Sequence, residues 1–273
     1  RRFVEADLRI ATGLVEPHFM AGWSGGRKVI APGIAHADTI TAFHSARFME
    51  HPGCDNCVLD GNPLHEEQLE IVAMLGGATA LNVVIDEARR ISMINFGEVV
   101  ESHMAAVAHM RAYAEIPVAE RFPTVVTSAA GYPLDKTYYQ TVKGMVGALD
   151  ILQPGGSLVI ASACSEGMGS AEYVASQRRL IEIGGERFLE GIKAKSHAAV
   201  DEWQTEMLLK PLRAGRVGLY TDGLSEADFA LTGVEPVASV AEAVAEAAAA
   251  AGDRRIAVIP EGPYVVPRYR PAS

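Results

Sequence analysis

Thr124-Val-Val-Thr-Ser128 begins the part of the sequence that determines the fold class of this chain. The helical pattern Tyr138–Leu149 follows it, and Ser157-Leu-Val-Ile-Ala-Ser162 comes next. Short apolar runs rich in β-branched residues are typical of buried strands, and a longer helical pattern between two of them is typical of a β-α-β unit. The same alternation recurs along the whole sequence. It predicts an α/β fold with parallel or mixed sheets flanked by helices.

Further strands and helices extend this alternation on both sides of the segment. The other predicted strands are Leu8–Val15, Ala80–Ile85, Ile91–Asn95, Val217–Thr221 and Ile256–Ile259. The other predicted helices are Ala37–Met49, Leu64–Leu75, Val99–Ala114, Glu172–Ile183, Glu202–Lys210 and Val237–Ala251. The segment Ala114–Phe122 contains Pro117 and is followed by Pro123, so we interpret it as a linker between two lobes.

Composition narrows the class of protein. With 273 residues, of which 49% are hydrophobic, the chain can form one large domain or two of ordinary size. Its net charge of −10 argues against a nucleic-acid-binding surface. No apolar run approaches the roughly 18 residues that cross a bilayer. Three cysteines do not form a disulfide framework, so we expect a cytoplasmic protein that binds neither nucleic acid nor membrane.

The stretch Glu16-Pro-His-Phe-Met-Ala-Gly-Trp-Ser-Gly-Gly-Arg-Lys28 is the densest group of chemically useful residues. Its glycine pair allows backbone N–H groups to approach a ligand closely, and Lys28 can bind a phosphate or anchor a covalent group. His18, and His44 further on, offer acid–base or metal-binding nitrogens. The stretch is not a Walker A loop, because Val29 stands where a hydroxyl is required. A tight turn with a solvated Arg-Lys pair is the alternative.

A second group lies in the other lobe. Tyr139, Gln140 and Lys143 project to one side of a predicted helix start, where a phenol, an amide and an amine suit a small carboxylate or hydroxy acid. An ordinary solvated helix face is the alternative. Trp203 fits either a core position or a lid. Cys54-Asp-Asn-Cys57 has the spacing of half a zinc site, but no second pair accompanies it.

Taken together, these motifs resemble the lactate racemase family, the nickel-pincer racemases and epimerases of 2-hydroxy acids. The segments that carry the resemblance are Thr12-Gly13, Glu16-Pro-His18, Gly22-Trp-Ser-Gly-Gly-Arg-Lys28, Pro32-Gly33, Phe43-His44-Ser45, Gly61-Asn-Pro-Leu-His-Glu66, Tyr132-Pro-x-Asp135, Tyr139-Gln140-x-x-Lys143 and Trp203. They occur in the family's order and cover both lobes.

The resemblance implies a cofactor and specific roles. Lys28 would carry the nickel-pincer nucleotide, pyridinium-3-thioamide-5-thiocarboxylic acid mononucleotide, through a covalent bond, and His44 would be a nickel ligand. Contacts to the cofactor are expected from Gly25, Gly26 and Arg27. His18 would be one of two acid–base histidines. The residues expected to hold the substrate, a small 2-hydroxy acid, are Tyr139, Gln140, Lys143 and Trp203.

The reaction implied is reversible hydride transfer from the substrate Cα to the pyridinium carbon, with a transient 2-keto acid. The family's other catalytic histidine has no counterpart here, and the chain begins without methionine at Arg1. We therefore expect the C-terminal two-thirds of such an enzyme, inactive alone, whose partners are its missing N-terminal segment and the cofactor-maturation enzymes.

The resemblance also predicts the domain organisation. Residues 1–115 would be the remainder of an N-terminal cofactor-binding domain, residues 123–230 a C-terminal α/β domain, and residues 237–260 a helix and strand that return to the first domain. The active site would lie in the interdomain cleft. A non-catalytic two-lobed module that binds a small acid or nucleotide is the alternative. A zinc hydrolase ranks last, because the sequence contains no HExxH motif.

Overall fold

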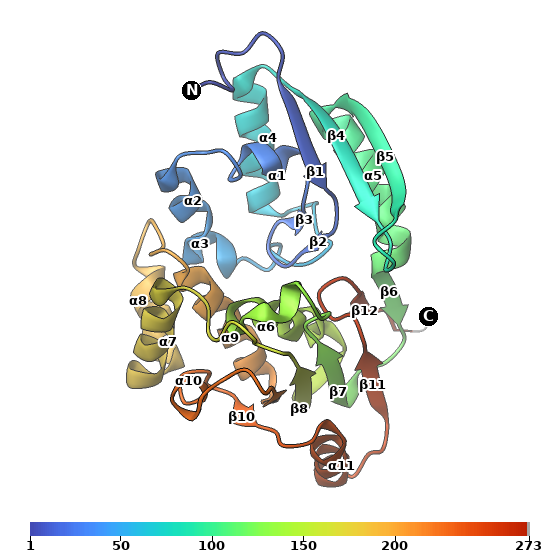
Figure 1. Cartoon of the computed structure of the whole chain (residues 1–273), viewed down its shortest axis with the longest axis vertical. Helices are drawn as coiled ribbons and strands as arrows, with labels where there is room; N and C mark the ends of the chain where they lie inside the picture. The colour runs from blue at the N-terminus through green and yellow to red at the C-terminus, as the bar shows by residue number, and fades with distance from the viewer. Residues whose placement is uncertain (272–273) are drawn as a thin grey trace. The chain divides into compact units, whose positions relative to one another are not determined.

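The computed structural model describes residues 1–271, which divide into two compact units between Glu115 and Ile116 (Figure 1). The division falls within the predicted linker. That segment is not irregular, however, because β6 (Glu115–Val118) pairs with β12 (Val266–Tyr269). Every predicted strand is present, and the mixed α/β class is confirmed.

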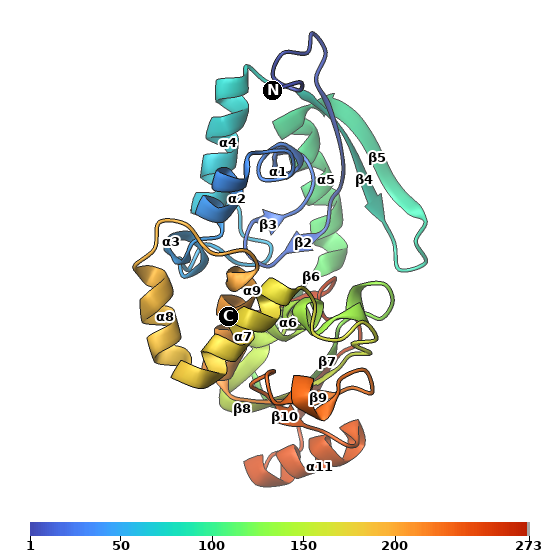
Figure 2. The same cartoon turned by 60° about the vertical axis from the view of Figure 1, so that its left-hand side comes forward.

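Unit 1 is built on a three-stranded mixed sheet in the order β1-β4-β5. Strands β1 (Ile10–Leu14) and β4 (Thr79–Ile85) are parallel, and β5 (Ile91–Glu98) returns antiparallel to β4. Helix α5 (Val99–Ala114) packs on β4 and β5. The shorter α1 (Arg27–Ile30) contacts β1, α5 and α4 (Pro63–Leu75) (Figure 2). The core between them contains Ala11, Ile30, Val72, Ala80 and Val99.

The second face of this sheet is also apolar. Leu14 lies beside Val83 on the neighbouring strand, and Val83 lies beside Ile94. Leu14, Ile94 and Phe96 are 37%, 57% and 59% exposed. A sheet that faces water on one side usually alternates apolar and polar residues, so this face departs from that pattern.

The predicted helix 37–49 is two helices, α2 (Ala37–Phe43) and α3 (Ala46–Met49). The backbone leaves the helical region at Ser45, whose ψ is 154°. Its hydroxyl donates to the Ala42 carbonyl at 2.7 Å, a local hydrogen bond that competes with helix continuation. His44 is therefore the C-cap of α2, not an interior helix position as expected.

Unit 2 contains a five-stranded parallel sheet in the order β10-β9-β8-β7-β11. The strands are β7 (Phe122–Ser128), β8 (Leu152–Ala161), β9 (Arg216–Tyr220), β10 (Glu235–Pro236) and β11 (Ile256–Ile259). The helices and 3-10 turns are η1 (Leu134–Lys136), α6 (Tyr138–Gly147), η2 (Leu149–Ile151), α7 (Ala171–Ile183), α8 (Gly185–Lys193), α9 (Glu202–Ala214), α10 (Glu226–Phe229) and α11 (Val240–Ala251). Helix α11 packs on one face of β7 and β8, whereas α6 and α9 cover the other (Figures 1 and 2).

The prediction that residues 237–260 return to the first domain is wrong. Strand β11 pairs in parallel with β7, with Ile256 opposite Thr124 and Ile259 opposite Thr127. This pairing places β7 inside the sheet, where both of its edges are hydrogen-bonded, and α11 covers the same strands. The second domain therefore extends beyond the expected limit of 230.

Helix α8 was not predicted. It is short, and two glycines, Gly184 and Gly185, stand at its start, so its helical signal is weak. Phe188 and Ile192, one turn apart, are buried and anchor it. No helix within residues 1–271 is both long and apolar enough to cross a membrane.

Candidate functional site

The Gly25-Gly26 turn is held by close packing within unit 1. Gly25 and Gly26 adopt φ values of 74° and 48°, which favour glycine. A Cβ on Gly26 would lie 2.5 Å from the Cβ of His103, and one on Gly25 would lie 2.6 Å from Val15. The Gly26 N–H donates to the Asn82 side chain at 3.2 Å. The contacts made by this turn are thus internal, and the expectation that it approaches a cofactor stays a prediction.

Arg27 is in the interior, with a side chain 0% exposed. Its guanidinium donates to the carbonyls of Ala21 at 2.8 Å and Trp23 at 2.9 Å, and to Nδ1 of His65 at 2.9 Å. Burial lowers the pKa of Arg27 to about 9, so it remains a cation at neutral pH. The structure gives Arg27 these partners inside the unit, and the cofactor contact that we expected of it stays a prediction.

Two histidines that we did not predict as site residues complete this cluster. Nε2 of His103 lies 3.0 Å from Nη1 of Arg27 and 2.9 Å from the Ser24 carbonyl. Burial, with the nearby guanidinium, lowers the pKa of His65 to about 4 and that of His103 to about 3. No local signal predicts their contacts with Arg27, because they lie 38 and 76 positions from it.

His18 lies on β2 (Pro17–His18), which forms a short antiparallel hairpin with β3 (Gly22–Trp23). Its Nδ1 accepts from the backbone N–H groups of Ala21 at 3.2 Å and Met20 at 3.4 Å. A neutral imidazole that accepts at Nδ1 carries its proton on Nε2. His18 is therefore held as the tautomer that donates at Nε2.

His44 is held in the opposite tautomer. Its Nδ1 lies 2.6 Å from the Ile40 carbonyl, which can only accept, so Nδ1 carries the proton and Nε2 the lone pair. Metal-bound histidines are commonly oriented by a backbone carbonyl in this way. The side chain is only 8% exposed, so its position at the end of α2 is well defined.

Lys28 follows Arg27 on α1 and is half-buried. Its backbone N–H donates to the Gly25 carbonyl at 3.0 Å, so the lysine is attached directly to the glycine turn. The helix has only four residues, and the buried side chains of Arg27 and Ile30 determine which of its faces packs against the core. Lys28 thus projects from a short, rigidly packed element.

The cysteine pair lies in the interior of unit 1. Cys54 and Cys57 are buried, and Cys54 Sγ lies 3.5 Å from the Asn62 side chain. Within residues 1–271 no three histidine, cysteine or acidic side chains gather where they could hold a metal. His65, which flanks the pair in sequence, contacts Arg27 instead.

The predicted substrate residues of unit 2 follow the carboxyl end of β7. Strand order reverses between β7 and β11, and ligands of open α/β sheets bind at the carboxyl ends of strands at such a point. The loop after β8 closes against the start of α6, because the Tyr138 and Tyr139 amides donate to the carbonyls of Gly167 at 2.9 Å and Met168 at 3.0 Å.

Tyr139 and Trp203 are joined directly. The Trp203 indole N–H donates to the Tyr139 hydroxyl at 2.9 Å, and the ring of Tyr139 packs edge-on against Tyr173 at 5.1 Å. Burial raises the pKa of the Tyr139 hydroxyl above its ordinary value, so it stays a proton donor at neutral pH. The structure brings these two predicted residues together.

Gln140 and Lys143 lie on the same helix. The Oε1 atom of Gln140 is buried and has no hydrogen-bond partner among residues 1–271. A buried amide oxygen without a partner is unfavourable, so this atom is a place where a ligand donor could bind. Lys143 is half-buried one turn further along α6.

A cavity of about 450 Å³ opens beside Tyr139. It is lined by Thr137, Tyr139, Glu166, Gly169, Ser170 and Asp201. Two of these side chains are hydrogen-bonded to each other, since Ser170 Oγ lies 2.5 Å from Asp201 Oδ2. Its hydroxyl-rich lining suits a small polar ligand better than an apolar one.

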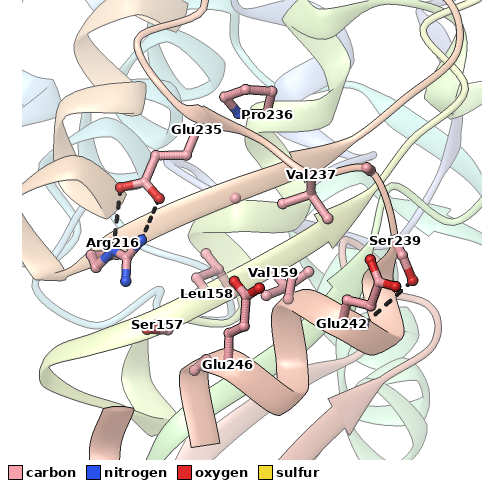
Figure 3. A pocket seen from close by; sticks show the side chains of 14 residues that line it. Ser157, Leu158, Val159, Arg216, Glu235, Pro236, Val237, Ser239, Glu242 and Glu246 are labelled. Carbon is pink, nitrogen blue, oxygen red and sulfur yellow. Dashed lines mark hydrogen bonds and ion pairs between the residues drawn. The ribbon is translucent and has the colours of Figure 1, made fainter. Parts of the chain in front are cut away.

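A second hollow of unit 2 lies away from all predicted site residues. It measures about 260 Å³, between α11 and strands β8, β9 and β10. Figure 3 shows Arg216 and Glu235 paired across its wall, at 2.6 Å between Nη2 and a carboxylate oxygen. Arg216 is the one cationic side chain among the residues that line this hollow, and it is engaged in this ion pair.

Comparison with known proteins shows which family this chain resembles. The family profile described as the lactate racemase C-terminal domain matches residues 119–266, and the one described as the lactate racemase N-terminal domain matches residues 1–55. A lactate racemase from Thermoanaerobacterium thermosaccharolyticum is 32% identical over 268 residues, which cover 98% of this chain and 63% of the relative. One from Lactiplantibacillus plantarum is 33% identical over 169 residues, which cover 62% of this chain and 40% of the relative.

Solved structures agree. The lactate racemase apoprotein from T. thermosaccharolyticum superposes with a TM-score of 0.90 at 32% identity, over 97% of this chain and 64% of that one. A Thermotoga maritima protein superposes with a TM-score of 0.68 at 15% identity over 99% of this chain and 69% of that one, which shows a shared fold alone. The chain thus spans somewhat less than two-thirds of the racemase that it matches over nearly its whole length.

Proposed function

Because this chain belongs to the lactate racemase family, we propose that it forms part of a nickel-dependent racemase or epimerase of a small 2-hydroxy acid. The observation that carries the proposal is the pair of histidines held in opposite tautomers on the unit that bears Lys28. His44 offers a lone pair at Nε2, and His18 offers a proton there. One is suited to a metal, the other to a substrate oxygen.

The residues present fit the nickel-pincer nucleotide. His44 has the neutral, backbone-oriented imidazole that tetragonal nickel accepts, and no cluster of other protein ligands accompanies it within residues 1–271. A metal at His44 would therefore take its remaining ligands from the cofactor. Lys28 would hold that cofactor through its amine, and when bound the group supplies a carbon that accepts the substrate's hydride and returns it.

The protein's own side chains would manage the proton and the substrate. As held, His18 donates at Nε2 and stabilises negative charge on the 2-oxygen of the substrate. To take the hydroxyl proton at Nε2 it must adopt the other tautomer, for which its Nδ1 must leave the Ala21 amide.

In unit 2, the ammonium of Lys143 would bind the substrate carboxylate. Gln140 Oε1, which has no partner among residues 1–271, would accept from a substrate hydroxyl. The Tyr139 hydroxyl, oriented by Trp203, would donate to the same ligand in place of the Asp201 carboxylate. The expectation that the site lies between the two domains stays a prediction, as do the cytoplasmic location and the inactivity of the chain alone.

The test uses the whole protein, produced together with the cofactor-maturation enzymes. Intact-mass and nickel analysis should show an adduct on Lys28 and bound nickel, and a chiral assay should show interconversion of one 2-hydroxy acid among short, dicarboxylic, aromatic and sugar-derived candidates. Lys28→Arg, which keeps the charge but cannot form the bond, should lose both adduct and turnover. Racemisation with unmodified Lys28 would contradict the cofactor assignment.

The alternative, a module that binds a small acid without catalysis, predicts a different result. Loaded protein would then bind a 2-hydroxy acid, as calorimetry would detect, but none of the candidates would change its chirality. A donor at Nε2 of His18 fits both functions, so the chiral assay decides between them.

A further inference from the structure

Arg27 is a buried cation without a carboxylate partner. Its side chain is 0% exposed, and within residues 1–271 it forms no salt bridge. Burying a charge is unfavourable unless hydrogen-bonding groups replace the lost water. Here two backbone carbonyls and Nδ1 of His65 accept from the guanidinium in place of water, and Nε2 of His103 lies 3.0 Å from it. The guanidinium therefore fixes the positions of the groups that surround it.

The two imidazoles are suited to this role because they stay neutral. Burial and the guanidinium charge keep the pKa values of His65 and His103 well below neutrality. His65 Nδ1 therefore remains an acceptor for the Nε–H of Arg27. His103, on α5, donates from Nε2 to the Ser24 carbonyl at 2.9 Å and packs against the guanidinium with the same nitrogen at 3.0 Å.

The carbonyls bound by this cluster belong to the short segment Ala21–Ser24, which includes the end of the turn after His18, strand β3 and the residue that follows it. Arg27 binds the Ala21 and Trp23 carbonyls, and His103 lies against that of Ser24. The amide of Ala21, on the other side of the same residue, donates to Nδ1 of His18 at 3.2 Å. A continuous set of hydrogen bonds therefore runs from the guanidinium through Ala21 to the imidazole.

We propose that Arg27, with His65 and His103, is a buried clamp that locks His18 in the tautomer carrying its proton on Nε2. The clamp holds the turn so that the Ala21 and Met20 amides face Nδ1 of His18, which excludes a proton from that nitrogen. Arg27 is thus a positioning residue, and it acts through the backbone. The inference rests on the proposed function only in treating His18 as the acid–base group.

The clamp can be tested by NMR without nickel, cofactor or substrate. In the full chain labelled with ¹⁵N-histidine, the ring of His18 should show a single neutral tautomer, protonated at Nε2. In Arg27→Met it should show an average of both tautomers, and the Ala21 amide should exchange with solvent on the order of tenfold faster or more, because a charge-assisted hydrogen bond to that residue is lost.

Arg111→Met is the matched control. Arg111 lies over the Trp23 ring at 5.5 Å and donates to the Cys57 carbonyl, but it does not touch the turn carbonyls. In Arg111→Met, the tautomer of His18 and the exchange rate of the Ala21 amide should be the same as in the parent protein. A folded Arg27→Met protein with the parent's His18 tautomer and Ala21 exchange would overturn the proposal.

A second pair of variants covers the case in which Arg27→Met does not fold. His65→Gln retains an acceptor for the Nε–H of Arg27 and should resemble the parent, whereas His65→Leu removes it and should accelerate Ala21 exchange. Equal exchange in the two variants would also overturn the clamp. Because no readout depends on turnover, failure of racemisation and failure of the clamp are separate results.

Discussion

The Trp203 indole N–H donates to the Tyr139 hydroxyl at 2.9 Å, and this bond ties α9 to the first turn of α6. Because the hydroxyl accepts from Trp203, its own proton is directed elsewhere, toward the Asp201 carboxylate, and burial keeps that proton bound at neutral pH. The bond therefore orients Tyr139 as a donor beside the cavity that it lines.

The Tyr139–Trp203 bond should appear as energetic coupling. Tyr139→Phe and Trp203→Phe should each lower the free energy of unfolding by about 1 kcal/mol, and the double variant should lose less than their sum. Urea denaturation of the four proteins measures this. Tyr113→Phe, at a residue 65% exposed, should be neutral. Strict additivity of the two single losses would show that the bond contributes nothing.

Gly26→Ala should be much more destabilising than an alanine at another left-handed glycine. Gly76 has φ 78° and open space around its Cβ position, so Gly76→Ala measures the backbone cost alone, about 1 kcal/mol. Gly26→Ala adds a collision with His103 at 2.5 Å and should lose about 1–3 kcal/mol more. Chemical denaturation compares them, and equal losses would mean that His103 moves aside freely.

Unit 1 should lose stability on mild acidification. The pKa of His65 falls from 6.5 when unfolded to about 4 when folded, so between these values the unfolded chain binds more protons. The stabilising effect of neutral His65 is complete above about pH 6.5 and declines as the pH falls toward 4. Denaturation across this range measures it. In His65→Gln the decline should be smaller, and an unchanged pH profile would refute this assignment.

Nickel retention should depend on His44 and not on a neighbouring histidine. His44→Gln removes the oriented Nε2 lone pair and should reduce the nickel content of cofactor-loaded protein at least tenfold, in line with ligand losses at metal sites. His51→Gln alters an exposed ring that accepts from the Gly53 amide and should retain the parent's nickel content. Elemental analysis after gel filtration distinguishes them, and equal nickel in both would remove His44 from the site.

The apolar second face of the unit 1 sheet should bind a hydrophobic dye. Replacing Ile94 and Phe96 by threonine should reduce ANS fluorescence of the folded chain with little loss of stability, since both side chains are more than half exposed. Met74→Thr removes an isolated side chain that is 87% exposed and should change the signal little. Undiminished fluorescence in the double variant would place the dye elsewhere.

Local pattern was enough to predict the elements of this fold. The strand Thr124–Ser128 and the helix Val99–Ala114 were predicted within two residues, because β-branched runs and helical periodicity are properties of contiguous residues. The break at Ser45 was missed, since the helical pattern continues on both sides of it. The placement of β11 beside β7 was also missed, because strand order depends on pairing across more than one hundred residues.

For the candidate site, too, some features could be predicted from the sequence and others required the tertiary structure. By itself the sequence determined the α/β class, the family, and the order of His18, Lys28, His44, Tyr139 and Trp203 along the chain. Tertiary structure alone decided that Arg27 lies inside with His65 and His103, and that His18 and His44 hold opposite tautomers. The physical reason is that the direction of a side chain and the location of an imidazole proton are set by partners distant in sequence or by the exact turn of the backbone, and neither is encoded in residue spacing.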